Sequence, residues 1–62
     1  MQKFIRLPSV KSQTGKTTSR IYAEMAEGTF PKPVKIGPRA VAWLQSEIDA
    51  WIESKIAERE AA

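Results

Sequence analysis

Two adjacent stretches decide the fold: Thr17-Thr-Ser-Arg-Ile-Tyr-Ala-Glu-Met-Ala-Glu-Gly28 and Phe30-Pro-Lys-Pro-Val-Lys-Ile-Gly-Pro-Arg-Ala-Val-Ala-Trp43. In the first stretch, Thr17 is a residue type that caps helix N-termini. Gly28 is the type that most readily takes the left-handed conformation just past a helix C-terminus. These two signals predict a short helix over about 18–27.

That helix has two unlike faces. Ile21 and Met25 lie four residues apart and form one apolar stripe, with Tyr22 and the methyl group of Thr18 at its edges. At about 100° per residue, the opposite face carries small and polar side chains. They are Ser19, Arg20, Ala23 and Glu27.

The second stretch has the pattern of a β-hairpin. Pro31 and Pro33 prevent a helix there. The turn residues Gly37-Pro-Arg39 separate two runs that alternate at the period of strands. We therefore expect a hairpin over about 33–43, with its apolar positions at Val34, Ile36, Val41 and Trp43.

Two further helices flank these elements. Pro8 and Gly15 have the residue types of a first helical turn and a C-terminal stop, which predicts a helix over about 8–14. Towards the C-terminus, Ser46 and Asp49 have the spacing of a capping box and predict a helix over about 47–59. Its apolar face combines Ile48, Trp51, Ile52 and Ile56.

These elements define the fold class as mainly α with a small β-hairpin, in a winged helix-turn-helix arrangement over a single domain of residues 1–62. A hairpin alone is marginal in water, so it must pack on the helices. The phase of Trp43 and Trp51 favours core packing over stacking on single-stranded bases. The predicted core comprises Phe4 or Ile5, Leu7, Val10, Ile21, Met25, Phe30, Val34, Ile36, Val41, Trp43, Ile48, Trp51, Ile52 and Ile56.

The composition argues against several classes of protein. The 62 residues include no cysteine and no histidine, which excludes disulfides and argues against a metal site or a catalytic centre. Gly15-Lys-Thr17 resembles the end of a phosphate-binding loop, but Val10 stands where that motif needs glycine. With no long apolar run, we expect a cytoplasmic protein that is not an enzyme and has no cofactor, metal or membrane partner.

The charge is unevenly distributed. Residues 1–45 carry eight basic side chains against Glu24 and Glu27, whereas the remainder carries two basic against five acidic side chains. This asymmetry indicates a polyanionic partner for the front of the molecule. An ordinary solubilising surface is an equally good explanation of charge alone.

Several of these residues together resemble the AlpA family of phage and prophage regulators, from about Phe4 to Arg59. The resemblance is carried by Arg6-Leu-Pro8, Thr14-Gly15, Ser19-x-Ile-Tyr22, the run from Gly28 to Trp43, and Ser46-Glu-Ile-Asp-Ala-Trp-Ile52. It implies a winged helix-turn-helix domain, related to the DNA-binding heads of excisionases and MerR proteins, that binds double-stranded DNA.

The sequence departs from the family in the helix that would contact DNA. The family often has Leu-Ser-Arg-Ser-Thr before Ile-Tyr, whereas this chain has Lys16-Thr-Thr-Ser-Arg20. The arginine is in effect moved from the place of Thr18 to that of Arg20, and Ala23 stands where the family is often basic. We therefore expect this protein to recognise a different DNA sequence from other members of the family, or to dock on DNA at a shifted angle.

Arg20 is the best candidate for recognising a base, because arginine donates two hydrogen bonds to O6 and N7 of guanine. The alternative is a surface ion pair with Glu24, four residues along. Backbone N–H groups and hydroxyls at the start of the helix suit a phosphate, although Thr17 also caps. Tyr22 can contact a phosphate or pack on the core. Predicted DNA-binding residues are Lys16, Thr17, Thr18, Ser19, Arg20, Tyr22, Ala23 and, on the hairpin, Lys32, Lys35 and Arg39.

The expected function is that of a prophage-type transcriptional regulator of integrase or excision. One alternative is an excision factor that bends attachment-site DNA and contacts integrase. Another is a protein-binding inhibitor, which would use Phe4, Ile5 and the acidic face of the last helix. The expected partners are double-stranded DNA, integrase and further copies of the chain, in the bacterial cytoplasm and on the nucleoid when bound.

Overall fold

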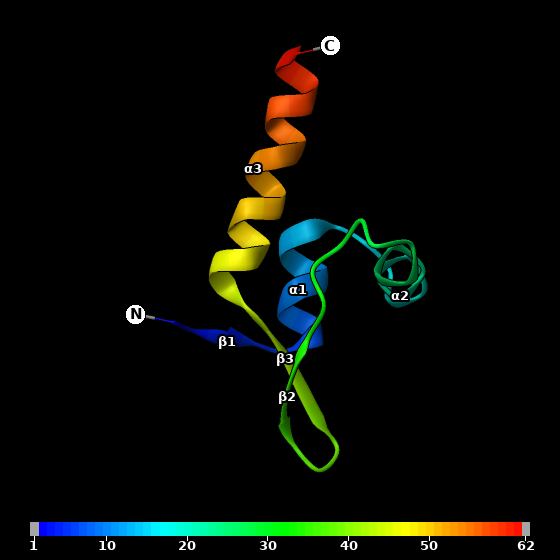
Figure 1. The fold of residues 1–62 in the computed structure, drawn as a ribbon, viewed down its shortest axis with the longest axis vertical. Helices are drawn as coiled ribbons and strands as arrows, with labels where there is room; N and C mark the ends of the chain where they lie inside the picture. Colours follow the sequence, from blue (N-terminus) through cyan, green and yellow to red (C-terminus); the bar gives the residue numbers. More distant parts are fainter. Residues whose placement is uncertain (1, 62) are drawn as a thin grey trace.

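The computed structural model describes residues 2–61 and contains three helices and three short strands (Figure 1). The mainly helical winged helix-turn-helix fold is therefore confirmed, with one strand more than the sequence predicts. In chain order the elements are β1 (Phe4–Ile5), α1 (Leu7–Thr14), α2 (Thr18–Glu27), β2 (Val34–Gly37), β3 (Ala40–Leu44) and α3 (Gln45–Ala61).

The ends of α2 follow from the local signals at its two caps. The hydroxyl of Thr17 accepts a hydrogen bond from the backbone N–H of Arg20 at 3.2 Å. Gly28 takes a φ of 80° and its N–H donates to the carbonyl of Met25 at 3.1 Å. Gly15, at φ 72°, ends α1 in the same way. These contacts satisfy backbone groups that the helix itself leaves unpaired.

The strands form one antiparallel sheet in the order β1-β3-β2. In the predicted hairpin, Lys35 lies opposite Val41, and the register shifts before Gly37 pairs with Ala40. The strand β1 is not among the predicted elements; in it, Phe4 pairs with Leu44 and Ile5 pairs with Trp43. A strand of two residues has no periodicity of its own, so only its partner β3 identifies it.

The start of α3 differs from the prediction. The helix begins at Gln45, directly after β3, and the Gln45 N–H donates to the carbonyl of Lys3 at 2.8 Å. The expected capping box is wrong: the Ser46 hydroxyl donates to the side chain of Gln2, and Asp49 accepts from the side chain of Gln45. A tertiary contact with the N-terminal segment has replaced the local cap. No helix within residues 2–61 is both long and apolar enough to cross a membrane.

The core lies where the sheet meets the three helices. Trp43 is fully buried, and its indole N–H donates to the carbonyl of Pro31 at 2.9 Å, which satisfies its polar atom. Leu7, Met25, Trp51 and Ile52 pack around the centre while remaining partly exposed. The buried residues are Ile5, Val10, Ile21, Phe30, Ala42, Trp43 and Ile48.

Several predicted core residues are exposed. Of the two alternatives Phe4 and Ile5, the structure buries Ile5 and exposes Phe4. Val34 and Ile36 lie on β2 at 38% and 44% exposure, and Ile56 lies on α3 at 36%. The reason is visible in Figure 1, where the hairpin and the C-terminal half of α3 extend in opposite directions beyond the packed centre. Their apolar faces continue past the elements that would cover them.

Candidate nucleic-acid interface

The outer face of α2 is the first part of the candidate interface. Ser19, Arg20 and Ala23 are exposed, while Ile21 on the opposite side is fully buried. Tyr22 is 46% exposed, so its ring lies at the surface rather than in the core. The helix thus presents short side chains near its N-terminus, together with one arginine, to solvent.

The N-terminus of α2 combines capping with free donors. Thr17 is exposed, and its hydroxyl oxygen accepts from the backbone N–H of Arg20. Accepting leaves the hydroxyl hydrogen available to donate, so capping and contact with an anion are compatible. Thr18 is half-buried and less accessible than Ser19.

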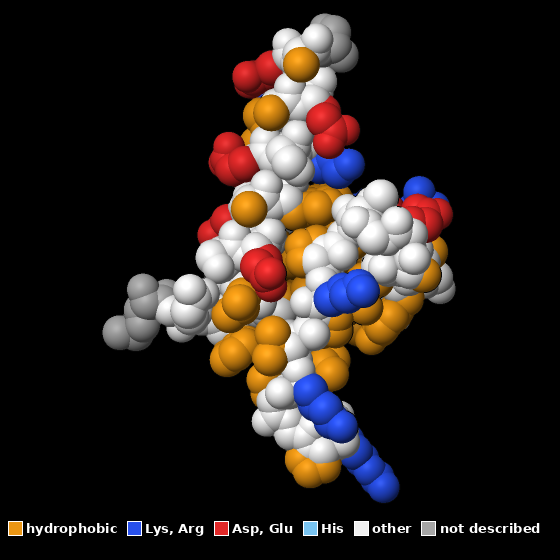
Figure 2. Space-filling model, viewed as in Figure 1, with side chains coloured by type: hydrophobic (Ala, Val, Ile, Leu, Met, Phe, Trp, Pro, Cys, Tyr) orange, Lys and Arg blue, Asp and Glu red, His pale blue; other side chains and the backbone are white. Residues whose placement is uncertain are grey.

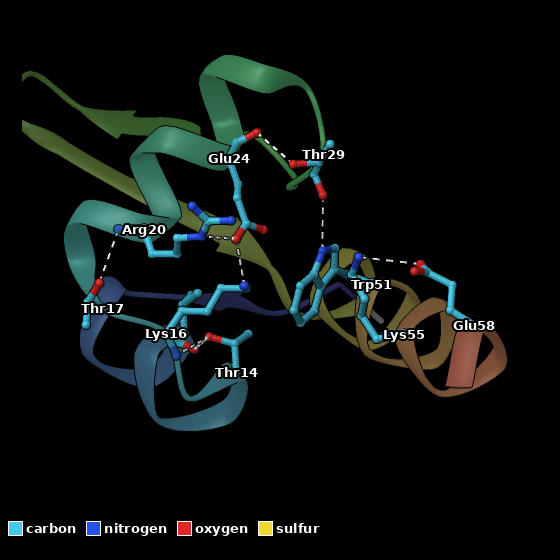
Figure 3. Close-up of polar contacts among 10 residues, drawn as sticks. Thr14, Lys16, Thr17, Arg20, Glu24, Thr29, Trp51, Lys55 and Glu58 are labelled. Carbon is cyan, nitrogen blue, oxygen red and sulfur yellow. Dashed lines mark hydrogen bonds and ion pairs between the residues drawn. The ribbon is translucent and has the colours of Figure 1, made fainter. Parts of the chain in front are cut away.

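Arg20 forms the ion pair that the sequence offered as its alternative role. One carboxylate oxygen of Glu24 accepts from Arg20 Nε at 2.9 Å and from Lys16 Nζ at 2.7 Å (Figure 3). The hydrogen bond from Lys16 is the main reason that the pKa of Glu24 lies below its ordinary value, and Arg20 adds to the effect, against the opposing influence of burial. The Arg20 side chain is nevertheless 62% exposed.

The burial of Glu24 is the feature of this site that the sequence did not predict, because the ion pair with Arg20 was expected at the surface. Glu24 is only 6% exposed, although a glutamate is rarely buried. A signal was present, because Glu24 lies three residues after Ile21 and next to Met25, on the edge of the apolar stripe.

Lys16 lies apart from the other predicted contact residues. Its side chain is 22% exposed, and Nζ lies 5.2 Å from the centroid of the Trp51 ring as well as beside Glu24. Its ammonium group thus faces α3 and the inner side of α2. The loop position of Lys16 gave no periodicity from which this direction could be predicted.

The hairpin is the second part of the candidate interface. Lys32, Lys35 and Arg39 are all exposed, and no ion pair within residues 2–61 involves them. Lys32 lies in the segment before β2, Lys35 lies in β2, and Arg39 lies in the turn between β2 and β3. Figure 2 shows basic side chains along the hairpin and acidic side chains along α3, so the uneven charge of the sequence becomes an uneven surface.

The fold and this surface define the class of small winged helix-turn-helix proteins. A family model described as "Prophage CP4-57 regulatory protein (AlpA)" matches residues 3–56. The chain therefore belongs to the AlpA family of prophage regulatory proteins, as the resemblance in its sequence implies.

Two relatives illustrate the match. An uncharacterized protein, ORF88, of Enterobacteria phage P4 is 41% identical over 58 residues, covering 94% of this chain and 66% of that protein. The DNA-binding transcriptional activator AlpA of Escherichia coli (strain K12) is 32% identical over 59 residues, covering 86% of this chain and 84% of that protein. The chain thus spans just under two thirds of the length of the phage relative.

Proposed function

We propose that this protein binds double-stranded DNA in a sequence-specific manner and regulates transcription of prophage integrase or excision functions. The observation that carries the proposal is the combination of an exposed polar face on α2 with three exposed basic side chains, Lys32 just before the hairpin and Lys35 and Arg39 on it. The relative from Escherichia coli, described as a DNA-binding transcriptional activator, supports it.

In the proposed complex, α2 lies in the major groove. Arg20 donates to a guanine, and such a bidentate contact discriminates against other bases by roughly 1–3 kcal/mol. The small Ala23 allows close approach and contacts a thymine methyl group. Ser19 and the free hydroxyl hydrogen of Thr17 hold a phosphate at the positive end of the helix dipole.

The hairpin acts as the wing in this arrangement. Lys32 and Lys35 neutralise phosphates, and Arg39 at the turn meets the minor groove or its phosphates. These contacts strengthen binding to any duplex, and each neutralised phosphate steepens the salt dependence by roughly one unit. Specificity therefore belongs to α2, and much of the affinity belongs to the hairpin.

We further propose that several copies of this domain bind side by side. One DNA-binding module of this size buries only about 600–1,000 Å² on DNA, which is little for a specific complex. A single recognition helix also contacts only a few base pairs. On this proposal the protein acts in the bacterial cytoplasm, on the nucleoid when bound.

The test is a gel-shift titration at two salt concentrations. It compares DNA flanking the protein's own gene, and any adjacent integrase attachment site, with random duplex of equal length. We expect discrete, salt-sensitive complexes that favour the flanking DNA. A preference for the attachment site together with DNA bending would assign the protein to excision, and equal binding to all duplexes would contradict the proposal.

Three variants separate the proposed roles. Arg20→Ala is expected to weaken binding to the preferred duplex by roughly 1–3 kcal/mol and to spare random DNA. Lys35→Ala is expected to weaken both and to lower the salt slope by about one. Arg59→Ala, which removes an exposed arginine near the end of α3, is the control and should change neither. Equal losses on both duplexes for Arg20→Ala would remove its role in recognition.

A further inference from the structure

Glu24 is the one buried charged side chain within residues 2–61. A carboxylate is retained in such a position only where charged or hydrogen-bonding partners compensate its loss of water. Here Lys16 Nζ and Arg20 Nε both donate to its Oε2 atom, at 2.7 and 2.9 Å. Glu24 thus connects a half-buried lysine to an exposed arginine (Figure 3).

The backbone of Glu24 and its partner Lys16 are both connected to α3 through Trp51. Thr29 donates to the Glu24 carbonyl twice, from its N–H at 2.9 Å and from its hydroxyl at 3.2 Å. The indole N–H of Trp51 in turn donates to the Thr29 carbonyl at 3.2 Å. Lys16 lies over the ring of the same tryptophan, so Trp51 supports Glu24 by two separate routes.

Glu24 contacts only the Nε edge of the Arg20 guanidinium. A guanidinium has five N–H donors in a rigid planar fork. Glu24 accepts from Nε, and within residues 2–61 no hydrogen bond involves the two Nη atoms. The end that carries both Nη atoms is therefore free to form the two parallel bonds that guanine O6 and N7 accept.

We propose, on the basis of the proposed function, that Glu24 is a positioning residue that holds Arg20 by its Nε and presents its Nη edge to one base. Lys16 compensates the charge of Glu24, so the positive charge of Arg20 remains available to DNA. Ordering the arginine before it binds reduces the rotamer freedom lost on binding. Lys16 accordingly acts inside the protein rather than on a phosphate.

The experiment measures the ratio of affinity for the preferred flanking duplex to affinity for random duplex. Glu24→Gln removes the charge at nearly constant shape, and Glu24→Asp keeps the charge but shortens its reach. We expect both changes to lower the ratio at least about twofold, the lower range of coupling between contacting residues. Glu53→Gln removes the same charge from an exposed position of α3, outside the candidate interface, and should leave the ratio unchanged.

A double-mutant cycle shows whether Glu24 acts through Arg20. In the Arg20→Ala background, Glu24→Gln should leave the ratio unchanged, because no guanidinium remains to be positioned. A merely structural role would weaken binding to both duplexes by the same factor and leave the ratio intact. Circular dichroism identifies any unfolded variant, and if Glu24→Gln is unfolded, Glu24→Asp decides alone.

Two results would overturn the proposal, and each differs from a failure of the proposed function. If Glu24→Gln and Arg20→Ala lower the ratio additively, Glu24 does not act through Arg20. If the ratio stays unchanged in the folded Glu24 variants while Arg20→Ala lowers it, Arg20 needs no positioning. A ratio of one for the unaltered protein would instead contradict sequence-specific binding itself.

Discussion

Ile48 and Ile56 provide a direct test of where the core ends along α3. The apolar periodicity of the helix assigns both to one face, but Ile48 is fully buried and Ile56 is 36% exposed. Replacing each by valine removes the same methylene-sized group from the same helix. The change in helix propensity is also the same, so the two variants differ mainly in what surrounds the lost atoms.

Burial sets the expected size of each effect. Ile→Val in a packed core lowers the free energy of unfolding by about 0.5–1.5 kcal/mol, from lost transfer energy and the cavity that remains. Ile48→Val should fall in this range, whereas substitutions at an exposed site usually stay within about 0.5 kcal/mol. For a domain of this size, each kcal/mol lowers the melting temperature by about 4–8 °C.

Urea unfolding followed by circular dichroism and tryptophan fluorescence measures both variants. The midpoint should shift for Ile48→Val at an unchanged slope, which indicates an effect on stability alone. Trp43 is buried and Trp51 half-buried, so unfolding changes the surroundings of both fluorophores. Equal losses for the two variants would refute the reasoning, because they would mean that Ile56 is covered as well as Ile48.

Three further outcomes follow from the polar contacts and caps of α2. In the folded protein the pKa of Glu24 lies below its ordinary value of 4.5. The stabilisation from its ion pairs should therefore be fully present above pH 4.5 and be lost as the pH falls through the folded pKa. Glu24→Gln should flatten that part of a stability profile measured against pH, and an unchanged profile would contradict the ion pairs. Gly28→Ala should cost about 1–2 kcal/mol, because its φ of 80° strains any L side chain even though no atom lies within 4 Å of the added Cβ. Chemical denaturation measures this, and a neutral result would mean that the helix end has rearranged. Thr17→Ala should cost about 0.5–2 kcal/mol through the lost cap, while Ser19→Ala serves as a nearly neutral control; equal effects would argue against the cap.

Part of this fold was determined by the sequence alone. The ends of α2 depend on Thr17 and Gly28, which act on backbone groups within a few residues of themselves. The hairpin depends on the prolines before it and on the turn at Pro38 and Arg39, which are local as well. The outward direction of Arg20 follows from the helical period. All of these are short-range effects, so a pattern in the sequence is sufficient to predict them.

The limits of the core were decided by the tertiary structure. Periodicity shows which side of an element is apolar, but not how far its neighbours extend along it. Ile36 and Ile56 are exposed for that reason, while the small Ala42 is buried where helices cover the sheet. The strand β1 likewise exists only because β3 offers backbone partners far away in sequence.

The same distinction applies to the candidate interface. The sequence placed Arg20 on an exposed face and offered Glu24 as its partner, but it did not predict that Glu24 is buried or that Lys16 turns inward. Those two features depend on Trp51, which α3 brings against the loop before α2. A contact between residues 35 positions apart in the chain has no local signal, because it exists only once the helices have packed.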